Sequence, residues 1–148
     1  QLQKANQKIK ENIKQWLTGY KMITDTVDIL DAKIINFGIS FTILVDPNYN
    51  KADVLKVATD QLIFIFSSKS YIGESFDILN IYRELQKVKG VLDVKDVPKI
   101  RNLSGLDYSS TSFNIQQNMS TDGNTIYIPR NAIYEIKYPT LDITGVAV

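Results

Sequence analysis

Two closely spaced acidic pairs are the residues of this sequence whose chemistry could be catalytic or metal-binding. Asp28 and Asp31 lie three residues apart, and so do Asp93 and Asp96. Paired carboxylates can act as general acid and base or as ligands of hard cations. Neither pair has a third ligand or a nucleophile nearby in the sequence. We therefore interpret both pairs as surface charges at strand ends.

Other reactive residue types are scarce. The 148-residue chain contains no histidine and no cysteine, which removes the usual general base, the commonest transition-metal ligands and a thiol nucleophile. The glycines have neither dinucleotide nor phosphate-loop spacing. Ser109, Ser110 and Ser112 lack the G-x-S-x-G frame of a nucleophile elbow. We expect no catalytic residue, no cofactor and no metal, so the protein is not expected to be an enzyme.

The charge balance limits the possible partners. Lysine and arginine total 17 and aspartate and glutamate total 16, giving a formal net charge of +1, which is too balanced for a typical nucleic-acid binder. No apolar run is long enough for a membrane span. We expect neither a nucleic-acid nor a membrane partner. The chain begins with Gln and lacks a signal-peptide pattern, so we expect a piece of a longer protein.

Residues 1–20 are predicted to form one amphipathic helix. Such a helix either packs on its own domain with its lysines in solvent, or presents a basic face to a membrane or a partner. We favour packing on its own domain. The apolar positions at helical spacing are Leu2, Ala5, Ile9, Ile13, Trp16, Leu17 and Tyr20, with Lys4, Lys8, Lys10 and Lys14 between them.

Residues 21–101 are predicted to form an α+β core domain with the order strand, helix, helix, strand. Strict alternation over residues 35–45 predicts a long strand, and residues 24–30 predict a shorter strand before it. Asn50 and Asp77 are expected to cap the two helices. The helices should cover one sheet face, in a ferredoxin-like sandwich. The weakly polar row of the long strand is then solvated or overlaid by another subunit.

Gly90 is expected to end the second helix in a left-handed conformation, because Val91 begins a strand immediately after it. Pro98 has no backbone N–H to donate to a neighbouring strand. The far end of that strand should therefore lie at a sheet edge or leave the sheet.

Residues 102–148 are predicted to form a small β region after a linker over 102–112. Short strands are expected at 113–117 and 125–128, joined by a turn at Asp122-Gly123, with two more strands in 131–138 and 140–148. Little helix is available to cover them, so they pack either within the monomer or on another chain. We predict a homodimer with interface residues Ile126, Ile128, Ile133, Tyr134, Ile136, Tyr138, Leu141 and Ile143.

The order and spacing of several segments resemble the J-like baseplate proteins of contractile phage tails. The resemblance covers roughly residues 20–101. Together with the last residues, the chain is similar to the C-terminal portion of baseplate wedge proteins of T-even-like phages. The segments that carry the resemblance are "IINFGISFTILVD", "YNKADVL", "IGESFD", "VKGVLDV" and "IYIPRNAIYEIKYPTLDITGVAV".

The resemblance implies a structural protein of the virion, assembled in the bacterial cytoplasm. Its subunits would pair with one another and with other baseplate wedge proteins, linking wedges into a ring around the tail tube. Gly73 would lead into the second helix and Gly90 into the closing strand, both as structural turns. The alternative is a ferredoxin-like regulatory module that dimerises and binds a small ligand at its interface. A glycine-rich loop after the first strand would favour it, but "DPNY" at residues 46–49 does not provide one.

Overall fold

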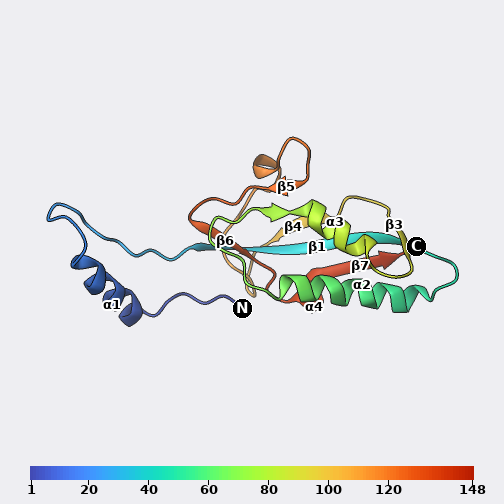
Figure 1. Ribbon diagram of the computed structural model, residues 1–148, viewed down its shortest axis with the longest axis horizontal. Coiled ribbons are helices and arrows are strands. Elements are labelled where there is room, and N and C mark those ends of the chain that lie inside the picture. Colours follow the sequence, from blue (N-terminus) through green and yellow to red (C-terminus); the bar gives the residue numbers. More distant parts are fainter.

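A long central strand, β1, organises the molecule, with two helices against one face of its sheet and a third helix held away from it (Figure 1). The computed structural model describes all residues from 1 to 148. In chain order the elements are α1 (Gln7–Thr18), β1 (Lys33–Val45), α2 (Lys51–Phe66), β2 (Phe76–Asp77), α3 (Ile78–Gln86), β3 (Val91–Val94), β4 (Lys99–Leu103), a 3-10 helix (Gln116–Asn118), β5 (Thr125–Ile126), β6 (Ala132–Glu135), α4 (Pro139–Asp142) and β7 (Ile143–Ala147).

The sheet has five strands. The long strand β1 lies in the centre, and each of its two sides is paired by two short strands placed one after the other. β3 and β4 both run antiparallel to β1 along one side, and β6 and β7 both run parallel to it along the other. Ile39 pairs with Ile100 on one side and with Ile143 on the other. Pro98 lies in the break between β3 and β4, which confirms that the chain leaves the sheet there. The short helix α4 interrupts the opposite side.

The alternating pattern of β1 produces the core. Its inward row is buried throughout, and α2 and α3 cover that row with one apolar side each. Burying each such side chain stabilises the fold by about 1.5–3 kcal/mol. Asn50 accepts a hydrogen bond from the Ala52 N–H (2.9 Å), and Asp77 accepts one from the Leu79 N–H (2.9 Å), so both predicted N-caps are confirmed.

Gly90 has the predicted left-handed conformation, but it does not itself end the helix, because α3 ends at Gln86 with Lys87 as a right-handed C-cap. Gly90 has a φ of +94° and Gly73 a φ of +76°, a region that other residues adopt only with strain. Gly90 is also crowded, because a Cβ atom there would lie 2.9 Å from Val54 Cγ2. The end of α3 and the start of β3 can therefore lie close to the first turn of α2 only with glycine at this position.

The mixed α+β class is confirmed, whereas the expected organisation of the C-terminal half needs correction. β6 and β7 pair directly with β1, so residues 102–148 complete the core of residues 21–101 instead of forming a separate β region. The physical reason is that β1 is a central strand whose second side needs a hydrogen-bonding partner. A ferredoxin-like arrangement is not confirmed, because β3 returns directly beside β1 after the two helices.

Two short predicted strands do not form. Residues 24–30 have no strand to pair with, and they remain irregular. Residues 113–117 lead into the 3-10 helix instead, because Asn114 accepts a hydrogen bond from the Gln117 N–H and its carbonyl accepts one from Asn118 Nδ2. Such local side-chain hydrogen bonds compete with strand pairing. The predicted Asp122-Gly123 turn does form, with a φ of +72° at Gly123.

The prediction that the N-terminal helix packs on its own domain is wrong. α1 lies beyond the β6 end of the sheet, clear of the other helices (Figure 1), and none of its residues is buried. No helix of the chain combines the length and apolar character that crossing a membrane requires.

Candidate functional site

The most unusual feature of the molecule is the segment of residues 1–32, which we call the arm. It starts against β6, extends outward through α1, and returns through residues 19–32 to the beginning of β1 (Figure 1). Both ends of the arm are therefore held at the body, and α1 lies at its far end.

The apolar side of α1 faces solvent. Asn6 caps the helix by accepting a hydrogen bond from the Lys8 N–H (3.0 Å). Trp16 and Tyr20 pack together with ring centroids 4.8 Å apart. We call the row of Ile9, Ile13, Trp16 and Tyr20 the α1 stripe; its side chains are 52%, 44%, 65% and 76% exposed. A continuous apolar row of this kind normally packs against the protein's own core or against a binding partner.

The acidic pair Asp28 and Asp31 holds α1 against the returning part of the arm. Lys10 Nζ lies 2.8 Å from Asp31 Oδ2, and Lys14 Nζ lies 3.8 Å from Asp28 Oδ1. The Lys14–Asp28 pair is exposed and contributes little energy by itself, whereas the side chains of the Lys10–Asp31 pair are only 17% and 28% exposed. Together the two pairs orient the helix. The two aspartates are thus surface charges, although on the arm and not at strand ends.

The second acidic pair lies on the body and is also exposed. The Tyr82 hydroxyl donates a hydrogen bond to Asp93 Oδ1 (3.1 Å), and this bond raises the pKa of Tyr82. Asp96 lies in the break between β3 and β4. Nowhere in the chain do three or more acidic side chains converge in a way that could hold a metal ion.

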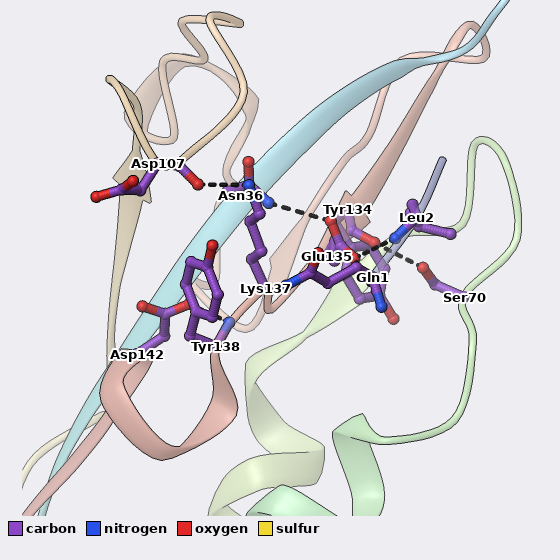
Figure 2. Close-up of polar contacts among 10 residues, drawn as sticks. All are labelled: Gln1, Leu2, Asn36, Ser70, Asp107, Tyr134, Glu135, Lys137, Tyr138 and Asp142. Atoms are coloured by element: carbon purple, nitrogen blue, oxygen red, sulfur yellow. Dashed lines mark hydrogen bonds and ion pairs between the residues drawn. The ribbon is translucent and has the colours of Figure 1, made fainter. Parts of the chain in front are cut away.

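A chain of hydrogen bonds fixes the foot of the arm to the sheet (Figure 2). The Leu2 N–H donates to Glu135 Oε1, and Asn36 Nδ2 donates to Glu135 Oε2 at 3.3 Å. Asn36 is a buried polar residue of β1, and its Oδ1 accepts from the Ser109 N–H at 2.7 Å. Buried amides need such partners, so Asn36 connects the arm, β6 and the loop that contains Ser109.

This loop, residues 104–115, covers part of the weakly polar side of β1. Asn102 Nδ2 donates to the Asn36 carbonyl (3.2 Å), while Asn102 Oδ1 accepts from the Phe113 N–H (3.0 Å). The chain itself therefore covers the Asn36 end of this face, and no second subunit is needed there. The signal available in the sequence was an asparagine in a row whose other members, Gly38, Ser40, Thr42 and Leu44, are smaller or less polar.

A buried carboxylate ties the same loop to α4. The Tyr108 hydroxyl donates to Asp142 Oδ1 (2.6 Å), and the Tyr138 N–H donates to Asp142 Oδ2 (2.9 Å). The hydrogen bond to this carboxylate, with burial as a smaller cause, raises the pKa of Tyr108 to about 12. Tyr108 thus keeps its proton at neutral pH, and its hydrogen bond to Asp142 connects the loop to α4.

A cleft of about 430 Å³ lies where the foot of the arm meets the end of α2, β2 and β6. Its aromatic lining comes from Phe66, Phe76 and Tyr134. Burial, followed by the negative charge of Glu74, raises the pKa of Tyr134 to about 12. Ser70 Oγ donates to the Tyr134 carbonyl (2.7 Å). The polar groups here hold the backbone in place, and none pairs a nucleophile with a base.

Most of the residues predicted at a subunit interface are instead packed within the chain. They do not form a common outer surface, because five of the eight are buried, Tyr134 and Tyr138 are half-buried, and only Leu141 is exposed. Tyr134 packs against Phe37 and Phe76, Tyr138 packs against Tyr108, and Leu141 is 71% exposed. The buried members are Ile126, Ile128, Ile133, Ile136 and Ile143.

Comparison with protein-family models and with curated proteins finds no match to this chain. The baseplate resemblance therefore rests on the sequence segments quoted above, and the site is interpreted from its own geometry.

Proposed function

We propose that this chain is a structural subunit of a larger protein assembly and that the arm binds a neighbouring subunit. The observation that carries the proposal is the exposed α1 stripe on a helix without a single buried residue. A helix of 12 residues is only marginally stable without packing. A partner that covers the stripe would therefore both stabilise α1 and remove its apolar side chains from water.

The charge of the arm favours a protein partner over a lipid surface. The arm has a formal charge of +1, because it contains five lysines and four acidic residues. The lysines are Lys4, Lys8, Lys10, Lys14 and Lys21, and the acidic residues are Glu11, Asp25, Asp28 and Asp31. Two of the lysines are already paired with aspartates of the arm. Attraction to an anionic bilayer needs several free basic residues, at about 1 kcal/mol each.

The assembly is, in this proposal, the baseplate of a contractile phage tail. The support is the sequence resemblance over roughly residues 20–101 and at the C-terminal end. A rigid body with a projecting apolar arm is what a subunit needs in order to link its neighbours into a ring. Its partners would be its own copies and other baseplate wedge proteins, and its location the virion.

Immunogold labelling of virions tests the assignment directly. Antibodies raised against the 148-residue chain should label the tail baseplate of the phage that encodes it. Labelling of the head or sheath, or absence of the protein from purified virions, would contradict the assignment. The role of the arm is tested by Trp16→Asp, which should prevent incorporation, while Gln15→Asp should not, because Gln15 adds the same charge to α1 outside the stripe.

A further inference from the structure

Both ends of the arm are attached to the same strand, β6. At the returning end, the Lys33 N–H donates a hydrogen bond to the Asn131 carbonyl (2.8 Å), immediately before β6. At the starting end, the Leu2 N–H donates to the side chain of Glu135, the last residue of β6. A strand rises by about 3.3 Å per residue, so the two attachment points lie about 13 Å apart. The arm is therefore a closed loop based on β6, with α1 at its far end (Figure 1).

The body holds the Glu135 carboxylate in a fixed orientation. Its side chain is 11% exposed, and its Oε2 accepts a hydrogen bond from Asn36 Nδ2 (3.3 Å). Asn36 is itself buried in β1. The other oxygen of Glu135 is thereby directed at the Leu2 N–H (Figure 2). Satisfied polar networks of this kind rigidify the groups that they contain, so the arm starts from a rigid acceptor.

The arm has little else to fix its direction. No residue of α1 is buried, and residues 19–32 contain no helix or strand. The two ion pairs of α1 join it to the returning part of the arm, and not to the body. With the attachment at Lys33 alone, the arm could turn as a unit about the start of β1. The second attachment at Glu135 removes this freedom, because two separated points define a direction.

We infer that Glu135 is a positioning residue for partner binding, because its contact with the Leu2 N–H fixes the direction in which the α1 stripe faces. The inference rests on the proposed function, in which the arm binds a neighbouring subunit. It holds for any partner that covers the stripe. A binding element that is already ordered associates more tightly, since association does not have to order it. Glu135 lies at the opposite end of the arm from the stripe, so it acts without touching the partner.

Leu2→Pro tests the inference from the side of the arm, because proline has no N–H to donate. The substitution leaves the hydrogen bond between Glu135 and Asn36 in place, so a purely structural role of Glu135 in the body is not disturbed. Leu2→Ala is the matched control. It also truncates a side chain that lines the cleft, but it keeps the N–H.

The direction of the arm is measured between two spin labels by pulsed electron paramagnetic resonance. The labels are attached through Gln15→Cys on α1 and Lys56→Cys on α2, two exposed positions in a chain without cysteines of its own. Dilution with unlabelled chain restricts the measurement to distances within one copy. The chain with Leu2 and the Leu2→Ala variant should both give a narrow distance distribution, and Leu2→Pro a clearly broader one.

Two outcomes of the distance measurement would overturn the inference. The first is a distribution that stays narrow in Leu2→Pro. The second is equal broadening in Leu2→Pro and Leu2→Ala, because the Leu2 side chain, and not Glu135, would then hold the arm. Urea denaturation should give the same unfolding midpoint for all three chains, since none of these changes reaches the body.

Sedimentation equilibrium of the unlabelled chains measures the consequence for association. Leu2→Pro should raise the dissociation constant for self-association about tenfold, because association would then also have to order the arm, and Leu2→Ala should leave it unchanged. If Leu2→Pro had no effect while Trp16→Asp abolished association, the inference would fail and the proposed function would stand. If Trp16→Asp associated as well as wild type, the proposed function would fail, and the inference with it.

Discussion

α1 and α3 are both short amphipathic helices with a capping side chain at the N-terminus, yet their apolar sides have opposite fates. Those of α3, including Ile78, Ile81 and Leu85, are buried, whereas those of α1 face solvent. The difference lies in the connections. α3 is joined to β2 and β3 almost without loops, so it must lie on the sheet, while residues 19–32 allow α1 to lie away from it. Periodicity defines an apolar face, and connectivity decides what can cover it.

The comparison implies that the two regions respond differently to substitution. Changes in the body should alter the free energy of unfolding, because each core side chain contributes buried apolar area. Changes in the arm should alter association and leave unfolding of the body almost unchanged.

The largest effect is expected from replacing Tyr134 and Ile136 together by aspartate. Two uncompensated charges would enter the core at a cost of several kcal/mol each, comparable to the whole stability of a domain. Circular dichroism should show an unfolded chain. Leu141→Asp is the matched control, because this exposed residue should change stability by no more than about 0.5 kcal/mol. A folded double variant that lost only its self-association would restore the interface role of β6.

Gly90→Val should destabilise the body by about 2–4 kcal/mol, because positive φ strain and overpacking add together. The added side chain would collide with Val54 and Tyr49. Gly105→Val separates the two causes, since Gly105 also has a positive φ but no atom within 4 Å of its Cβ position. Urea denaturation should show a clearly smaller loss for Gly105→Val; equal losses would remove crowding from the explanation.

Tyr108→Phe should cost about 1.5–3 kcal/mol at neutral pH, the value of a hydrogen bond to a charged partner. The pKa of Tyr108 is raised from 10.0 to about 12 in the folded chain. Its contribution is therefore complete below about pH 10 and is lost as the pH rises towards 12. Unfolding curves across this window should lose part of their pH dependence in Tyr108→Phe. The exposed Tyr127 provides the control, as Tyr127→Phe should retain the full dependence.

Removing the N-cap of α3 in the body and the N-cap of α1 in the arm compares the two regions by the same kind of substitution. Asp77→Ala removes the acceptor for the Leu79 and Asn80 N–H groups and should cost about 1 kcal/mol of global stability. Asn6→Ala removes the equivalent cap of α1, so it should reduce helical circular dichroism and leave the cooperative unfolding transition in place. An equal shift of that transition by both variants would mean that α1 folds as part of the body.

The parts of the fold that the sequence predicted have local signals. Alternation identified β1, the side chains of Asn50 and Asp77 marked the starts of α2 and α3, and the helix-to-strand change at Gly90 required a left-handed residue. Each signal lies within a few residues of the structure that it determines. Such local patterns predict the same element whatever the tertiary arrangement around it.

The misassigned parts depend on long-range pairing. Nothing within residues 131–148 specifies that they pair with β1, so their apolar side chains were open to an interface interpretation that the sheet excludes. Asn36 likewise acquires its role only when Glu135 and Ser109 arrive beside it. At the arm, the stripe was visible in the sequence, but its exposure depends on how residues 19–32 run.

Sedimentation equilibrium of the wild-type chain beside Trp16→Asp and Gln15→Asp tests the central claim most directly. The arm lies outside the fold, so both variants should unfold within about 0.5 kcal/mol of wild type. Wild type and Gln15→Asp should associate as concentration rises, and Trp16→Asp should remain monomeric. A wild-type chain that stays monomeric at every concentration, or a Trp16→Asp chain that associates as well as wild type, would contradict the assignment of the arm as the element of self-association.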